Sequence, residues 1–138
     1  MKSVFYIADK YVYPSLRRLL VLRLRSKGAR PAEIARLLGL SRSLVTRYLK
    51  GERGKYIDFT MYSDVVEAID KLADTLLKGR IRADEATLVL SGLTMYVLGK
   101  RYVCNLHAEI DDIDPSKCGL CPRLFSNTSL EDLLLLTS

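Results

Sequence analysis

Apolar residues recur every three or four positions along most of the 138-residue chain, which is the spacing of helices that bury one face. Glycine and proline interrupt these stretches, as they do at helix ends. The pattern predicts an all-α protein, with helices over residues 14–27, 31–39, 41–49, 63–78, 84–102 and the last ten residues. Residues 3–8 are instead rich in Val, Phe, Tyr and Ile, so we expect a short strand or an extended lead-in there.

Residues 31–49 predict two short helices that meet at Gly39. Pro31 fits a first helical turn, where its missing N–H costs nothing. Gly39 can adopt positive φ and end the first helix sharply, and Ser41 is a favourable N-cap for the second. The exposed face of the second helix is left with Arg42, Ser43, Thr46 and Arg47. The pattern is that of a helix-turn-helix whose second helix enters the DNA major groove. The alternative is an ordinary helical hairpin with a solvated polar face.

The letters SRSLVTRYLKGERG (residues 41–54) resemble the reading helix and exit loop of the lambda-repressor-like (XRE-type) DNA-binding family. The resemblance implies that the helix over residues 41–49 reads bases. The loop that follows is punctuated by glycines, and its backbone N–H groups and cations suit phosphate contacts. The predicted DNA-binding residues are therefore Arg42, Ser43, Thr46, Arg47, Lys50, Arg53 and Lys55.

Charge divides the chain into two unlike halves. Residues 1–60 hold 14 basic and 4 acidic residues, whereas residues 61–138 hold 8 basic and 12 acidic residues. We therefore predict a DNA-binding domain over residues 1–60 and a helical dimerisation and metal-binding region over residues 61–138. The basic residues of the helix over 14–27 can reach phosphates or simply face solvent. No apolar run is long enough to cross a membrane, so we expect a cytoplasmic protein without membrane contact.

The helix over residues 84–102 is apolar nearly all round, and such a helix must be buried on more than one side. The leucine-rich tail, Leu133 to Leu136, also cannot bury all its side chains against one face. A chain this small has little core to cover both segments. We therefore expect a homodimer, with an unremarkable core or a frayed tail as the alternative.

All three cysteines and the single histidine lie within 18 residues, in the pattern C-x2-H-x10-C-x2-C. Two close pairs separated by a loop are typical of tetrahedral zinc sites. The predicted metal ligands are Cys104, His107, Cys118 and Cys121. An iron–sulfur cluster is the rival cofactor, because Cys121 precedes a proline as in some cluster motifs. Free thiols beside an unrelated histidine are the remaining possibility.

With these residues included, the whole chain resembles a group of small archaeal predicted transcriptional regulators. They join a lambda-repressor-type helix-turn-helix to a short C-terminal region bearing Cys and His. Many members carry a further Cys pair just before the tail, where this chain has Leu88 to Gly92, which favours a single four-ligand site. The resemblance implies a dimeric, sequence-specific regulator that reads a palindromic operator in double-stranded DNA.

Two other classes of function stay open beside this interpretation. One is an adaptor that uses the helix-turn-helix and the leucine-rich tail to dock proteins, and another is a regulator that senses metal or redox state. We do not expect an enzyme, because no nucleophile–base pair or phosphate-cradling glycine loop is present. The patterns point to no particular effector.

Overall fold

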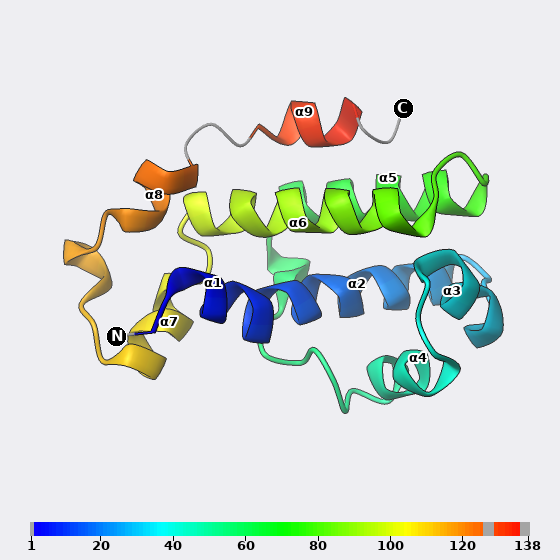
Figure 1. Cartoon of the computed structure of the whole chain (residues 1–138), viewed down its shortest axis with the longest axis horizontal. Coiled ribbons are helices and arrows are strands. Elements are labelled where there is room, and N and C mark those ends of the chain that lie inside the picture. The colour runs from blue at the N-terminus through cyan, green and yellow to red at the C-terminus, as the bar shows by residue number, and fades with distance from the viewer. Residues whose placement is uncertain (1, 126–128, 136–138) are drawn as a thin grey trace.

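The computed structural model describes residues 2–125 and 129–135, and this part of the chain is helical without any strand (Figure 1). The N-terminal elements are α1 (Val4–Ile7), the π-helical turn η1 (Ala8–Val12), α2 (Tyr13–Ser26), α3 (Pro31–Leu38) and α4 (Arg42–Leu49). A 3₁₀ turn, η2 (Phe59–Met61), leads into α5 (Ser63–Leu77) and α6 (Ala83–Gly99). The C-terminal elements are α7 (Cys104–Asp111), the 3₁₀ turn η3 (Pro115–Lys117), α8 (Leu120–Phe125) and α9 (Leu130–Leu135).

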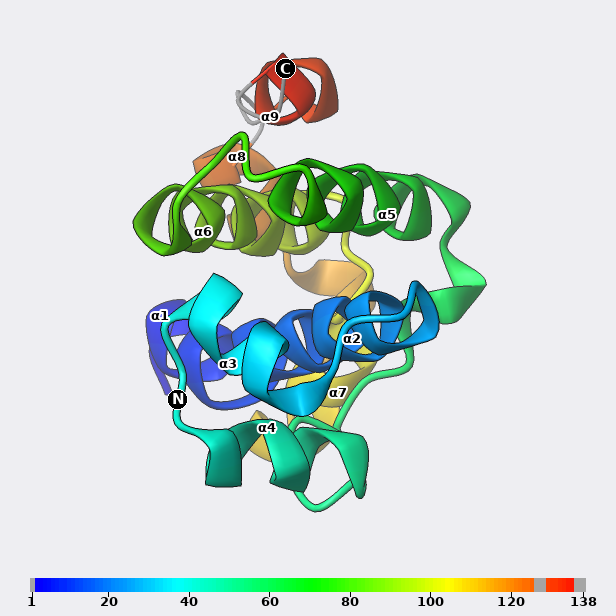
Figure 2. The ribbon, with the colours of Figure 1, turned by 90° about the vertical axis from the view of Figure 1, so that its right-hand side faces the viewer.

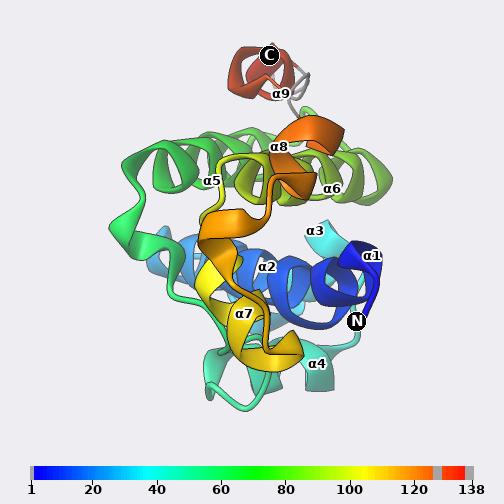
Figure 3. The same ribbon diagram turned by 90° about the vertical axis from the view of Figure 1, so that its left-hand side faces the viewer.

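Helix α2 lies between two layers of helices. The antiparallel hairpin of α5 and α6 covers one side of α2 and α4 covers the other, whereas α3 lies beside α2 and also contacts α6 (Figures 1 and 2). The C-terminal segment wraps around one end of the molecule: α7 lies near the N-terminus, where the N–H of Lys2 donates to Asp111, and α8 returns to α6 (Figures 1 and 3). Helix α4 therefore lies at the edge of the molecule opposite α9, where a large partner can reach it.

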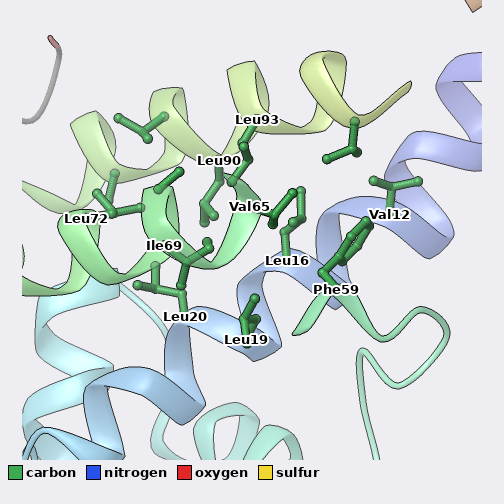
Figure 4. Close-up of a cluster of buried hydrophobic side chains, with 14 of the residues drawn as sticks. Val12, Leu16, Leu19, Leu20, Phe59, Val65, Ile69, Leu72, Leu90 and Leu93 are labelled. Carbon is green, nitrogen blue, oxygen red and sulfur yellow. The ribbon is translucent and has the colours of Figure 1, made fainter. Parts of the chain in front are cut away.

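One hydrophobic core joins the N-terminal and C-terminal parts of the chain. Leu16 and Leu20 of α2 pack with Ile69 of α5 and Leu90 of α6, and all four are essentially inaccessible to solvent (Figure 4). Ion pairs fasten the same contact at its rim, since Arg23 binds Asp70 at 2.6 Å and Lys27 binds Asp74 at 3.0 Å. The predicted domain boundary at residue 60 remains a prediction. The residues before and after this boundary pack against each other in the shared core.

The expectation of a strand or extended segment over residues 3–8 is wrong, because these residues form α1 and the start of η1. The hydroxyl oxygen of Ser3 caps α1 by accepting the N–H of Phe5 at 3.2 Å. Val4 and Ile7 are spaced as on one helical face, and both are buried. Packing of this face outweighs the strand preference of the β-branched and aromatic residues.

The chain's own helices cover most of the apolar surface of α6. Nine residues of α6 are buried, and α2, α3, α5, α8 and α9 all contact it. Gly92 makes room for α9, because a Cβ at this position would overlap the side chain of Leu133. The cover that we expected from a partner subunit thus comes largely from within the chain, and dimerisation is not shown. Leu136, the last of the four tail leucines, lies outside the described residues.

Two further findings concern the predicted helix ends and the search for membrane-spanning helices. The helices over 14–27, 63–78 and 84–102 form within one to three residues of their predicted ends. Among residues 2–125 and 129–135, we find no helix that is both long and apolar enough to cross a membrane.

Candidate nucleic-acid interface

The predicted helix-turn-helix is present as α3 and α4. Gly39 ends α3 in the left-handed conformation, with φ +65° and ψ 34°. The hydroxyl oxygen of Ser41 caps α4 by accepting the N–H of Leu44 at 3.2 Å. Ile34 of α3 and Val45 of α4 are fully buried, so the contact between these two helices excludes water. Gly39 and Ser41 therefore correctly predicted the turn between the two helices.

The four residues expected to read bases all lie on the exposed side of α4, at the edge of the molecule (Figure 2). The hydroxyls among them are already engaged: Thr46 donates to the carbonyl of Arg42 at 3.0 Å, and Ser43 Oγ lies 3.2 Å from Ser41 Oγ. Arg42 and Arg47 form no hydrogen bond or ion pair through their side chains within the described residues. The two arginines are thus the side chains on α4 most available to a partner.

The loop after α4 extends this basic surface. Lys50, Arg53 and Lys55 are exposed, and in the part of the chain that the structure describes none of them is bound to a carboxylate. Two acidic residues, Glu52 and Asp58, lie between α4 and η2, and Asp58 bonds to Thr60. By contrast, Arg23 and Lys27 on the opposite side of α2 are paired with acids of α5. The positive charge left uncompensated on α4 and its exit loop is the electrostatic feature that a polyanion would meet.

Two arginines of α2 hold α4 in place rather than reaching out from the surface. Arg17 Nε donates to the hydroxyl of Tyr48 at 2.8 Å, and its guanidinium lies over the rings of Tyr13 and Tyr48. Arg18 Nε donates to the carbonyl of Tyr48 at 3.2 Å. These bonds fix the last turn of α4 against α2. This role of Arg17 and Arg18 is not evident from the sequence, because helical spacing alone does not say which arginines bind a neighbouring helix.

Gly54 packs the exit loop tightly against the start of α2. Its φ is +70°, and a Cβ there would overlap the carbonyl oxygen of Pro14 and lie 2.9 Å from Tyr48 Cε1. A little further on, the N–H of Ile57 donates to Ser15 Oγ at 3.2 Å. The loop is therefore anchored between Arg53 and Lys55, at Gly54, and again two residues after Lys55, at Ile57.

The four predicted metal ligands line one small cavity of about 10 Å³, roughly the room of a single water molecule. Cys104 and His107 come from α7, Cys121 comes from α8, and Cys118 precedes α8. Their donor set of three thiols and an imidazole suits zinc. Among the described residues, however, no group of three His, Cys, Asp or Glu side chains is placed to hold a metal ion. The structure thus brings the four residues to one cavity but does not show the metal-binding loop.

A hydrogen bond orients the side chain of His107, and burial changes the pKa of Cys121. His107 Nε2 lies 2.8 Å from Asp111 Oδ2, an arrangement that fixes an imidazole ring in many metal sites. Burial, together with the nearby Cys104 and Cys118, raises the pKa of the Cys121 thiol to about 11. All three cysteines are free thiols. In the absence of a cation the Cys121 thiol therefore stays protonated at neutral pH.

Comparison with known proteins supports the helix-turn-helix and leaves the rest of the chain unassigned. Residues 14–56, from the start of α2 to the exit loop, match the family model of a homeodomain-like domain. No curated protein and no solved structure matches the chain. The match does not confirm the lambda-repressor-like type, an archaeal source or the Cys/His region. The chain contains an N-terminal helix-turn-helix domain of a kind that suggests DNA binding.

Proposed function

We propose that the protein is a sequence-specific DNA-binding transcriptional regulator that reads the major groove with α4. The observation that carries this proposal is the exposed, unpaired arginines on the outer face of α4, within a helix-turn-helix that matches a homeodomain-like family. The proposal makes the protein a binding protein and not an enzyme.

Arg42 is the proposed base-reading residue. It is the first residue of α4, and the N-terminal part of the reading helix contacts base edges in this motif. A bidentate pair between arginine and guanine discriminates against other bases by about 1–3 kcal/mol. Arg47 lies further along the exposed face of α4, and Lys50, Arg53 and Lys55 are proposed to bind phosphates.

Selection of bound sequences from a random duplex pool tests this proposal. We expect the wild type to enrich a defined motif, and Arg42→Ala to lose preference at one base pair in each half-site. Arg80→Ala, an exposed arginine in the turn between α5 and α6, is the matched control and should keep the wild-type motif. If the wild type enriches no sequence and its duplex binding is insensitive to salt, the adaptor alternative is favoured instead.

The proposed assembly is a homodimer. Exposed Phe5, Leu88 and Met95 lie on α1 and α6, and a groove of about 460 Å³ separates these two elements. A second copy that covers this apolar face would supply the second reading helix. The selected motif is then expected to be a palindrome with half-sites one helical turn, about 34–36 Å, apart. A single asymmetric site bound by a monomer would contradict the dimer without affecting the proposed DNA binding.

A zinc ion held by Cys104, His107, Cys118 and Cys121 is the proposed cofactor. The four side chains line one cavity, and the donor set and the His107–Asp111 bond fit such a site. The bound ion would join α7 to α8 and stabilise a segment that has few core residues of its own. An iron–sulfur cluster remains the alternative, and metal analysis of protein purified without oxygen distinguishes the two.

A further inference from the structure

A cluster of tyrosines and lysines lies beside the exit loop of α4, and all of its members except Tyr56 precede the residues that match the homeodomain-like domain. We call it the Tyr–Lys cluster; its members are Lys2, Tyr6, Lys10, Tyr11 and Tyr56. We propose that this cluster is a second DNA-backbone contact, which binds phosphates beyond those reached by α4 and its loop. The inference rests on the proposed function and extends its footprint.

Contacts within the cluster orient its lysine. Lys10 Nζ donates to the hydroxyl of Tyr6 at 2.9 Å and lies 5.4 Å and 5.5 Å from the ring centroids of Tyr6 and Tyr11. Lys2 Nζ lies 5.7 Å from the centroid of the Tyr6 ring. Lys10 is nonetheless exposed and bound to no carboxylate among the described residues, so its charge faces solvent in a restricted position. Cations and tyrosine hydroxyls of this kind are common ligands of DNA phosphates.

The cluster is joined directly to the proposed DNA-binding loop. The rings of Tyr11 and Tyr56 meet edge to face at a centroid distance of 5.0 Å, and Tyr56 follows Lys55 in the chain. The loop runs beneath α2 from α4 toward the N-terminal helices, on the side of the molecule where α4 lies (Figure 1). The basic surface of the loop therefore continues into the cluster on one side of the protein.

The position of Lys10 along the helix sets the reach of this contact. Arg18, which binds the last turn of α4, follows Lys10 by eight residues, and eight residues of helix span about 12 Å. Phosphates of one strand are spaced about 3.4 Å along the DNA axis, so 12 Å would correspond to three or four phosphates for a helix that lies along this axis. The nearby carboxylate of Asp111 is already engaged, because it accepts hydrogen bonds from the N–H of Lys2 and from His107. Its negative charge lies beside Lys2, so Lys10 is the cation of the cluster chosen for the test.

The test is the salt dependence of duplex binding by the full-length protein, measured by fluorescence anisotropy over a series of salt concentrations. Lys10→Gln should flatten the log–log salt slope by about 0.9, which corresponds to about eightfold weaker binding at 0.1 M salt. Its base preference in the random-pool selection should not change. Lys10→Arg keeps the charge and should keep the wild-type slope.

Lys100→Gln is the matched control, since Lys100 is also exposed and lies 5.7 Å from the ring centroid of Tyr96, but in the α5–α6 layer. It should leave the slope unchanged. A wild-type slope in Lys10→Gln, or a Lys10→Arg variant as weak as Lys10→Gln, would overturn the inference. Stronger binding of single-stranded DNA that depends on Lys10 would also overturn it. These outcomes differ from failure of the proposed function, in which the wild type itself selects no sequence.

Discussion

Replacement of Gly54 by alanine gives a sharp test of how the exit loop is anchored. Gly54 is buried with φ +70°, and an added Cβ would overlap the Pro14 carbonyl oxygen and lie 3.0 Å from Arg18 Cβ. Gly79, after α5, has nearly the same φ of +69°, but nothing lies within 4 Å of its added Cβ. The two glycines therefore share the backbone conformation and differ in the space around them.

The magnitudes follow from this difference. An alanine in the left-handed region costs about 1–2 kcal/mol, and this cost applies to both positions. Overpacking adds about 1–3 kcal/mol, and only at Gly54, because backbone and ring atoms there cannot move without disturbing α2 and α4. We therefore expect Gly54→Ala to lower the free energy of unfolding by about 1–3 kcal/mol more than Gly79→Ala.

Urea denaturation followed by circular dichroism measures both free energies in the full chain. Equal losses in the two variants would refute the packing argument, because they would mean that only backbone strain matters. A loss in Gly79→Ala that exceeds the loss in Gly54→Ala would refute it as well. Gly54→Ala should also weaken DNA binding, since any shift of the loop displaces Arg53 and Lys55.

Two further predictions concern the contacts that hold the rest of the fold. Hydrogen bonds from Arg23 hold the pKa of Asp70 below its usual value, so their contribution to stability is present above about pH 4 and disappears as pH falls through the lowered pKa. Asp70→Asn should thus cost about 1 kcal/mol at pH 7 and nothing at low pH by urea denaturation. Glu67→Gln is the control on the same helix, and a cost that does not vary with pH would contradict the ion-pair explanation. Cys118→Ser should abolish the zinc content of protein purified without oxygen, and a wild type that binds no metal would contradict the proposed site.

The helix-turn-helix could be predicted from the sequence because its signals are local. A proline in the first turn, a glycine at positive φ and a serine N-cap each act within four residues of their own position, so no knowledge of the rest of the fold is needed. The same local rules gave the approximate ends of α5 and α6. The predicted DNA-binding residues are all exposed.

Features that depend on distant parts of the chain were not predictable in this way. Residues 3–8 become helical because Val4 and Ile7 reach the common core, and their strand-like composition gives no sign of it. Once that segment is known to be helical, Tyr6 and Lys10 are seen to lie one turn apart, which is the local signal for the Tyr–Lys cluster. The cover of α6 likewise depends on α8 and α9, which return to it from late in the chain.

The two faces of α2 connect the proposed reading helix to the proposed dimer surface through rigid contacts. Arg17 and Arg18 bind Tyr48 at the end of α4, whereas Arg23 binds Asp70 of α5 on the other side. Helix α5 packs in turn on α6, which carries the exposed Leu88 and Met95. Because α4, α2, α5 and α6 are joined by these direct contacts, a dimer formed through α6 would fix the distance between its two α4 helices. Such a dimer would accept one half-site spacing and reject operators in which a few base pairs are inserted between the half-sites.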